Sequence, residues 1–289
     1  MTKVSFSQYS TYSTCPRMYK HQYIDKLGES SANIATIFGT AMHETIQHYL
    51  SVFYGVSKKQ ANELNLDKML LEVMKREFLK EKEKMSSGAP ATQLEMEEHF
   101  GDGRWILEWF TKHIEKLYTK TGYELVGIEI PLNYEIKNGV HFTAFIDIVL
   151  RDIGSGEIVI IDLKTSTRGW NKYQKEDKIK NAQILIYKKV YSELFGIPMQ
   201  KIKVEFQIMK RKLMEESAFP QPRISKHIPA NGKPSVMKAF DEFMFFIDTV
   251  FDENGDRRID IQYPKTPGKN KKNCKYCEFF ERKICDGVE

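Results

Sequence analysis

Two aspartates and a lysine interrupt apolar segments that otherwise have the composition of buried strands. Asp147 lies within AFIDIVL, residues 144–150, and Asp162 lies within IVIIDLK, residues 158–164. An ionised carboxylate in such a strand is costly unless a charged group or a metal ion pairs with it. Lys164 follows Asp162 by two residues, so both side chains project from one face of an extended strand. Two carboxylates and an ammonium are therefore predicted to converge at neighbouring strand ends.

This group of residues suits metal-assisted hydrolysis of a phosphodiester bond. Mg²⁺ usually takes one or two carboxylates, together with water and the phosphate of the substrate. The metal polarises the phosphate and activates water, while Lys164 orients that water or stabilises charge on the phosphoryl group. The alternative is a half-buried salt bridge between Asp162 and Lys164 with a structural role alone.

The elements that must position these residues form a mixed α/β core. Periodicity predicts a helix, three strands, a helix and a fourth strand, at about 40–53, 123–131, 141–151, 157–163, 176–195 and 201–210. Turn signals favour an antiparallel meander of three strands, with the fourth strand returning beside the third. Residues 56–122 are expected to form a helical insertion, and residues 1–289 a single domain.

The first helix is predicted to begin at the Gly39-Thr40 pair, because this pair offers an N-cap before an apolar stripe. His43 then falls in the first turn. A single histidine on an amphipathic helix is more often structural than a metal ligand.

The ordered set of these residues resembles the core of the PD-(D/E)XK nuclease superfamily. The resemblance rests on Phe145-Ile-Asp147 followed by Ile161-Asp-Leu-Lys164. Gln183-Ile-Leu-Ile-Tyr187 resembles the Gln-x-x-x-Tyr signature of the RecB-like branch, and its two polar residues share one helix face. Gly39-Thr-Ala-Met-His43 resembles the Gly-x-x-x-His element of that branch. Ala144 departs from the family, which often has Gly there, and is expected to be tolerated in a strand.

The resemblance implies a restriction-endonuclease-like core of the α+β mixed-sheet type. It also implies Mg²⁺ or Mn²⁺ bound by His43, Asp147, Asp162 and the Leu163 carbonyl, and catalytic roles for Asp147, Asp162, Lys164, Gln183 and Tyr187. Glu129 in the preceding strand is a further candidate metal ligand. Its strand alternates apolar and polar residues, so a merely solvated Glu129 explains the pattern equally well.

The chain has four cysteines, at positions 15, 274, 277 and 285. Its start lacks the apolar stretch of a secretory signal, so we expect a cytoplasmic protein, in which structural disulfides are rare and metal ligation is favoured. Zinc sites usually draw on two close pairs, whereas here three cysteines cluster and one is remote, which argues against zinc, although zinc and free buried thiols stay as alternatives. The layout resembles the iron–sulfur exonucleases of the Cas-four type and the nuclease domain of AddB. That resemblance implies a [4Fe–4S] cluster held by Cys15, Cys274, Cys277 and Cys285, within segments 1–30 and 255–289.

The function expected from this resemblance is a metal-dependent DNA exonuclease that acts on single-stranded ends in recombination, repair or CRISPR-type processing. A formal net charge of +5 permits DNA binding without requiring it. The chain contains no apolar run of about 20 residues that would span a membrane. It also lacks a Walker A pattern, so a helicase would be a separate partner.

Two alternatives share parts of this pattern: a structure-specific endonuclease, and a non-catalytic DNA-binding adaptor. Retention of both aspartates and the lysine argues against the adaptor. Arg168, Trp170 and Tyr173 follow the catalytic lysine and are candidates to stack on bases or pair with phosphates. The alternative for these three residues is packing within the loop.

Overall fold

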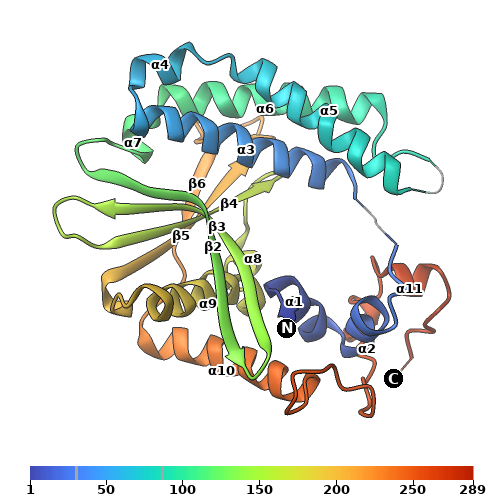
Figure 1. Cartoon of the computed structure of the whole chain (residues 1–289). Helices are drawn as coiled ribbons and strands as arrows, with labels where there is room; N and C mark the ends of the chain where they lie inside the picture. Colours follow the sequence, from blue (N-terminus) through green and yellow to red (C-terminus); the bar gives the residue numbers. More distant parts are fainter. Residues whose placement is uncertain (30–31, 86–87, 289) are drawn as a thin grey trace.

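The chain folds around one mixed β-sheet with helices on both faces (Figure 1). The computed structural model describes residues 1–29, 32–85 and 88–288. Its strands are β1 (Thr2–Val4), β2 (Tyr123–Lys137), β3 (Val140–Asp152), β4 (Ile158–Ser166), β5 (Ile202–Lys210) and β6 (Ile224–His227). Its α-helices are α1 (Phe6–Thr14), α2 (Pro16–Tyr19), α3 (Ile34–Gly55), α4 (Lys58–Glu63), α5 (Leu66–Lys84), α6 (Gln93–Lys112), α7 (Ile114–Leu117), α8 (Lys172–Lys175), α9 (Lys178–Phe195), α10 (Lys233–Val250) and α11 (Glu278–Glu281). Among the helices in these ranges, none is long and apolar enough to cross a membrane.

The sheet has the strand order β1-β3-β4-β5-β6, and β2 pairs along the other edge of β3. β2, β3 and β4 form the predicted antiparallel meander, and β5 returns parallel to β4, so both predictions are confirmed. β1, which was not predicted, pairs in parallel with residues 140–142 of β3. β4 pairs with residues 148–151 of the same strand. Among the described strands, residues 143–147 therefore lack a partner on the edge that β1 and β4 share.

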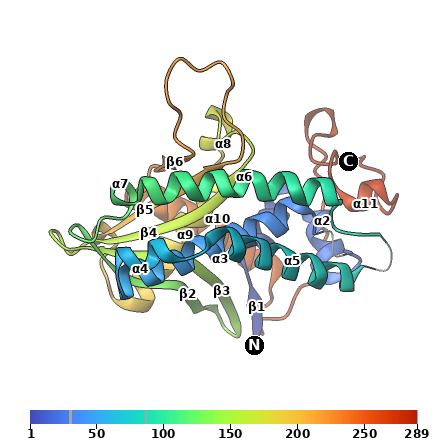
Figure 2. The ribbon, with the colours of Figure 1, turned by 90° about the horizontal axis from the view of Figure 1, so that it is seen from above.

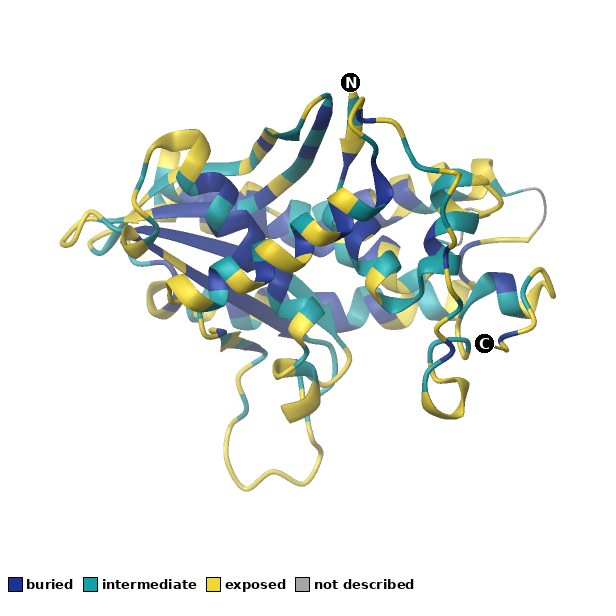
Figure 3. Cartoon of the chain, turned by 90° about the horizontal axis from the view of Figure 1, so that it is seen from below, coloured by how far each residue is buried: buried dark blue, intermediate teal, exposed yellow. Residues whose placement is uncertain are grey.

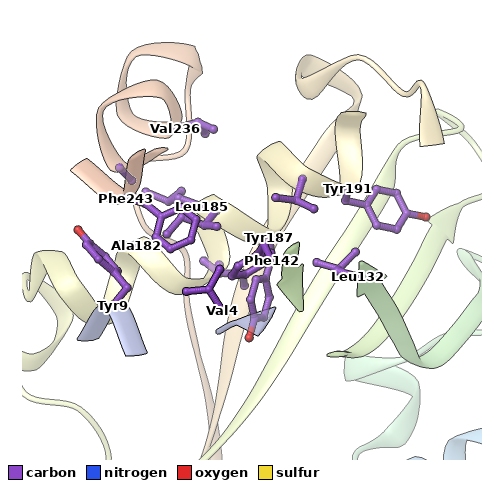
Figure 4. Packing of buried hydrophobic residues seen from close by; sticks show 14 of the residues in the cluster. Val4, Tyr9, Leu132, Phe142, Ala182, Leu185, Tyr187, Tyr191, Val236 and Phe243 are labelled. Atoms are coloured by element: carbon purple, nitrogen blue, oxygen red, sulfur yellow. The ribbon is translucent and has the colours of Figure 1, made fainter. Parts of the chain in front are cut away.

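One face of the sheet packs against α9 and α10. Figure 4 shows the apolar contact, in which Ala182 and Leu185 of α9 lie near Phe243 of α10 and Phe142 of β3. The predicted helix over 176–195 is confirmed as α9, which begins where the Asp177 side chain accepts two backbone N–H groups. The strands at the centre of the molecule are largely buried between the helical layers (Figure 3).

The opposite face packs against α3, α5 and α6, which lie above the sheet in Figure 1 and in front of it in Figure 2. The helices α4 to α7 all fall within residues 56–122, where a helical insertion was expected. Gly103 of α6 allows a close approach between these helices. A Cβ atom there would lie 2.5 Å from Leu70 Cδ2 of α5 and 3.1 Å from Phe38 Cε2 of α3.

The predicted start of the first helix is wrong. α3 begins at Ile34, and the Asn33 side chain caps it by accepting the N–H groups of Ala35 and Thr36. Asn is a strong N-cap, so it ends the non-helical segment before the Gly39-Thr40 pair is reached. His43 consequently lies near the middle of a 22-residue helix.

Candidate active site

Along both strands of the β2–β3 hairpin, the alternation of side chains between the two faces of the sheet changes at Glu129 and Asp147. On β3, Ile146 packs in the core shared with α9 and α10, whereas Ile148 packs in the core shared with α3. On β2, Ile130 and Ile128 divide between the two cores in the same way. Residues two apart in a regular strand share a face, so the change of face falls between them. The hairpin therefore presents Asp147 at the boundary between the two helical layers.

Asp147 also lies where β3 and β4 separate. Ile148 and Ile161 form the last residue pair of the two strands. Beyond this pair, the Leu163 N–H donates a hydrogen bond of 2.6 Å to Asp147 Oδ2. The carboxylate thus continues the hydrogen bonding between the strands across the gap, which fixes its position relative to β4.

Asp162 and Lys164 project together from β4, as their spacing predicted. Asp162 is 4% exposed, and its Oδ2 forms an ion pair with the Lys164 ammonium. The Lys164 side chain is 30% exposed, and its ammonium lies 5.9 Å from the centre of the Phe206 ring. The lysine therefore joins a buried carboxylate to the surface at which a substrate would arrive.

His43 reaches the same place from α3. Its Nδ1 lies 3.6 Å from Asp147 Oδ1, and its side chain is 25% exposed. Three separate elements, α3, β3 and β4, thereby bring an imidazole, two carboxylates and an ammonium together. The sequence predicted that these residues converge, but it did not predict which of their atoms are in contact.

The two carboxylates differ in how easily they ionise. Burial and the nearby charge of Asp147 raise the pKa of Asp162 to about 6, against the lowering effect of the Lys164 ammonium. Burial acts in the same direction on Asp147, but His43, Lys164 and the Leu163 N–H outweigh it and hold the pKa of Asp147 below its usual range. A cation bound beside both carboxylates would relieve their mutual repulsion.

Gln183 and Tyr187 enter the site from α9. The Gln183 Nε2 donates a hydrogen bond of 3.0 Å to the Tyr187 hydroxyl, as their shared helix face predicted. Burial raises the pKa of Tyr187, and the negative charge of Asp162 raises it further. The tyrosine hydroxyl is thus held protonated within the electrostatic reach of the carboxylates.

The donor chemistry of the site fits Mg²⁺ or Mn²⁺. Carboxylate oxygens, with an imidazole beside them, are ligands that these cations accept. Among the described residues, no group of three or more His, Cys, Asp or Glu side chains is arranged to hold a metal ion. A cation here would therefore complete its shell with water and substrate phosphate, which is the usual state of protein-bound Mg²⁺.

Glu129 lies opposite Asp147 in the β2–β3 register and belongs to the same hydrogen-bond network. Its Oε1 accepts a 2.5 Å hydrogen bond from Gln47 Nε2, and that amide also lies 3.4 Å from the Asp147 carbonyl oxygen. The backbone φ of Glu129 is 50°, in the left-handed region that non-glycine residues avoid. Gln47 could not be predicted as a site residue, because polar residues are common on helices and its sequence position does not distinguish it. The strain at Glu129 marks a position that the surrounding structure imposes.

A comparison of two substitutions tests that strain. Glu129→Gly and Glu129→Ala both remove the carboxylate, but Gly adopts a positive φ without cost. We expect the Gly variant to have the higher free energy of unfolding, by about 1 kcal/mol, which reverses the usual preference for Ala in a strand. Denaturant unfolding measures the difference. At Asn133, another exposed β2 residue, the same two substitutions should show the ordinary preference for Ala. If the Ala variant were the more stable of the two at both positions, Glu129 would not be strained.

Trp170 takes part in packing, which was one of its two predicted roles. Its ring lies 5.0 Å from that of Phe206 and 5.7 Å from that of His227, with the Lys180 ammonium 5.6 Å from its centre. Tyr173 on α8 is 83% exposed, and Arg168 is also exposed. The surface that follows Lys164 therefore offers an exposed aromatic ring and an exposed guanidinium beside a packed tryptophan.

The four cysteines line one small pocket between the two ends of the chain. Burial raises the pKa of Cys274, and the other three thiols contribute to the rise because they lie close to it. The Thr266 N–H donates to Cys15 Sγ at 3.4 Å. The Arg17 side chain donates to the Tyr263 carbonyl at 2.9 Å. Figures 1 and 2 show α2 beside α11. The remote Cys15 therefore shares a pocket with the C-terminal trio, but the described part of the chain holds no group of three or more His, Cys, Asp or Glu side chains arranged for a metal ion, so cluster binding stays a prediction.

Two acids and a lysine at the place where β3 and β4 separate within a mixed α/β sheet, with an imidazole beside them, define a site of the metal-dependent nuclease class. A family model described as the PD-(D/E)XK nuclease superfamily matches residues 3–286. The match covers nearly the whole chain, so the protein belongs to this superfamily. The chain matches no curated protein. The superfamily resemblance predicted from sequence is confirmed, and membership supports hydrolysis of phosphodiester bonds in nucleic acid.

Proposed function

We propose that the protein is a metal-dependent DNA exonuclease of the RecB-like branch that acts on single-stranded ends. The convergence of Asp147, Asp162 and Lys164 beside His43 carries this proposal. Gln183 and Tyr187 add to it, because the pair of residues typical of that branch approaches the same carboxylates. A superfamily nuclease that retains all of these groups has what the reaction needs.

Each side chain has a defined task in the proposed reaction. Asp147 and Asp162 would hold Mg²⁺ or Mn²⁺, with His43 and the Leu163 carbonyl as further ligands. The bound cation would polarise the phosphate and lower the pKa of a water molecule. Lys164 presents its ammonium to the phosphate, where it stabilises the charge that develops during cleavage. The Gln183–Tyr187 pair supplies a neutral hydroxyl next to the carboxylates.

The preference for single strands rests on the surface that follows Lys164. Single-strand binders combine cations that follow the backbone with aromatic rings on which bases stack. Arg168 and Tyr173 are both exposed there. A double helix keeps its base faces stacked, so an exposed ring is of use chiefly for unpaired bases. Recombination, repair and CRISPR-type processing all generate such ends, and a helicase that unwinds DNA would be a separate protein.

The proposed second cofactor is a [4Fe–4S] cluster held by the four cysteines. Support comes from the donor set, since four sulfurs without a carboxylate suit soft metal centres. Further support comes from the pocket, which is lined by apolar residues such as Met18, Phe279 and Phe280 as well as by the thiols. A cluster there would tie the N-terminal helices to the C-terminal segment. Zinc is the alternative occupant.

The activity test uses the wild-type chain with Mn²⁺ and DNA labelled at either the 5′ or the 3′ end. We expect single strands to be shortened from an end, duplexes to be cut more slowly, and covalently closed circles to survive. Gel electrophoresis of timed samples separates these results. Cleavage of circles would instead indicate the structure-specific endonuclease. Complete inactivity on every substrate would support the non-catalytic adaptor and reject the proposal.

A pair of lysine variants shows whether cleavage belongs to this site. Lys164→Ala should reduce the rate by at least about a hundredfold, because it removes the cation that stabilises the transition state. Lys68→Ala on α5 is the matched control, since the Lys68 side chain is 70% exposed and pairs at 3.8 Å with Glu72, outside the surface that follows Lys164. The control should keep the wild-type rate. Cleavage that survives Lys164→Ala would reject the mechanism.

A further inference from the structure

Phe145 is an exposed aromatic residue on the strand that carries Asp147. Its side chain is 60% exposed, while the other large apolar residues around it on β3, Phe142, Ile146 and Ile148, are fully buried. Ile146 packs toward α9 and α10. Because side chains alternate along a strand, Phe145 projects from the face of the hairpin that these helices do not cover.

The location of Phe145 separates it from an ordinary exposed apolar residue. It lies two residues before Asp147, which corresponds to roughly 6–7 Å along a strand. It also lies within residues 143–147, where β3 has no described strand on the edge between β1 and β4. A phosphate bound at Asp147 would place a neighbouring nucleoside within reach of the Phe145 ring.

A second ring lies directly across from Phe145. The register pairs it with Pro131 of β2, which is also exposed. Cross-strand partners place their Cβ atoms about 5 Å apart, so the phenyl and pyrrolidine rings form one apolar surface. Pro131 lies two residues from Glu129 on β2, and Phe145 lies two residues from Asp147 on β3, so this apolar surface is close to the turning point of the hairpin.

We propose that Phe145, backed by Pro131, is a stacking subsite for the unpaired base next to the scissile phosphate. The proposal rests on the function proposed above and names one contact by which that site would prefer single-stranded DNA. A base within a duplex is covered by its neighbours and does not offer a free face to this ring. Every base has an aromatic face, so the subsite would be tolerant of sequence.

Binding of a fluorescently labelled single-stranded oligonucleotide tests the subsite. The measurement is fluorescence anisotropy with Mn²⁺ and the full chain in the Lys164→Ala background, so that bound DNA stays intact. Phe145→Ala should weaken binding by roughly 5- to 100-fold, the range for one stacked base. Phe145→Tyr should keep the affinity, and Phe145→Leu should lose it, because leucine is apolar without a ring.

Phe245→Ala is the matched control. Phe245 lies on α10 and is 70% exposed, so the same truncation removes a similar amount of exposed ring away from the site. Its affinity should equal that of the background protein. Both truncated side chains are exposed, so the melting temperature should stay close to that of the parent in each variant.

Oligonucleotides with one abasic position complete the test. At one position, loss of the base should weaken binding to the parent by the same factor as Phe145→Ala, and should cost the Phe145→Ala variant nothing further. Additive losses at every position, or full affinity in Phe145→Ala or Phe145→Leu, would overturn the subsite. This result is independent of cleavage: an inactive wild type rejects the proposed function, whereas the binding cycle alone decides the role of Phe145.

Discussion

Asp162→Asn is expected to abolish strand cleavage and, at the same time, to stabilise the metal-free protein. Activity should fall by at least about a hundredfold, because the variant loses a charged ligand at the centre of the site. Stability should rise because the wild-type carboxylate is 4% exposed and ionises only with difficulty. Its pKa of about 6 exceeds the ordinary value of 3.8, so ionisation at pH 7 costs about 1–3 kcal/mol in the folded state.

The sign of the pH dependence provides a second measurement of the same effect. Between about pH 4 and pH 6 the folded protein holds more protons at Asp162 than the unfolded chain does. The contribution of Asp162 to the stability of the metal-free wild type should therefore decrease as the pH rises through this window, so the difference in stability between wild type and Asp162→Asn should change by that contribution. Urea unfolding in the presence of a chelator, repeated across these pH values, measures both chains.

Asp248→Asn is the control for the Asp162 experiment. Its side chain is 61% exposed and forms only a surface ion pair with Lys137. This variant should keep its activity and change the free energy of unfolding by less than about 1 kcal/mol. If Asp162→Asn were less stable than the wild type, the Asp162 carboxylate would not be a destabilising buried charge. If Asp162→Asn kept its activity, Asp147 and Asp162 would not form the metal-binding site.

The residues of the site were predictable from sequence because their signals are local. Charged residues within apolar runs marked Asp147 and Asp162, and turn residues between those runs fixed the antiparallel meander. The spacing of two between Asp162 and Lys164 predicted the shared face on which their ion pair forms. The same ion pair is what a purely structural interpretation also predicts. Membership of the nuclease superfamily, and not the contact itself, favours a catalytic role.

Two of the features that escaped prediction, β1 and the backbone conformation of Glu129, depend on residues distant in sequence. β1 has only three residues, and it is defined by pairing with β3 about 140 positions away. The left-handed φ of Glu129 follows from the turning of the hairpin, since glutamate has no preference for that conformation. The true start of α3 was missed for a local reason, because the Gly39-Thr40 pair also has the composition of an N-cap.

Cys285→Ser is expected to lose iron and to lower the melting temperature substantially. The proposed cluster would link Cys15 to three cysteines near the C-terminus, and so would close nearly the whole chain into a loop. Losing such a link costs about 2–5 kcal/mol, by comparison with a lost disulfide. For a chain of this size that corresponds to roughly 3–8 °C. Iron and sulfide content, the visible absorption spectrum and thermal unfolding of protein purified without oxygen measure the change.

Thr266→Ala is the matched control for the cysteine variant. Thr266 lines the same pocket, and its contact with Cys15 Sγ comes from the backbone N–H, which the substitution leaves in place. It should keep its iron and nearly all of its stability. Bound zinc in place of iron in the wild type would contradict the cluster, and an unchanged melting temperature in Cys285→Ser would contradict its structural role. The cysteine pocket and the acid pair are built from different elements, so DNA cleavage by the folded fraction of Cys285→Ser should persist at low temperature. If Cys285→Ser lost both its iron and its DNA cleavage, the cluster would also stabilise the strands that carry Asp147 and Asp162.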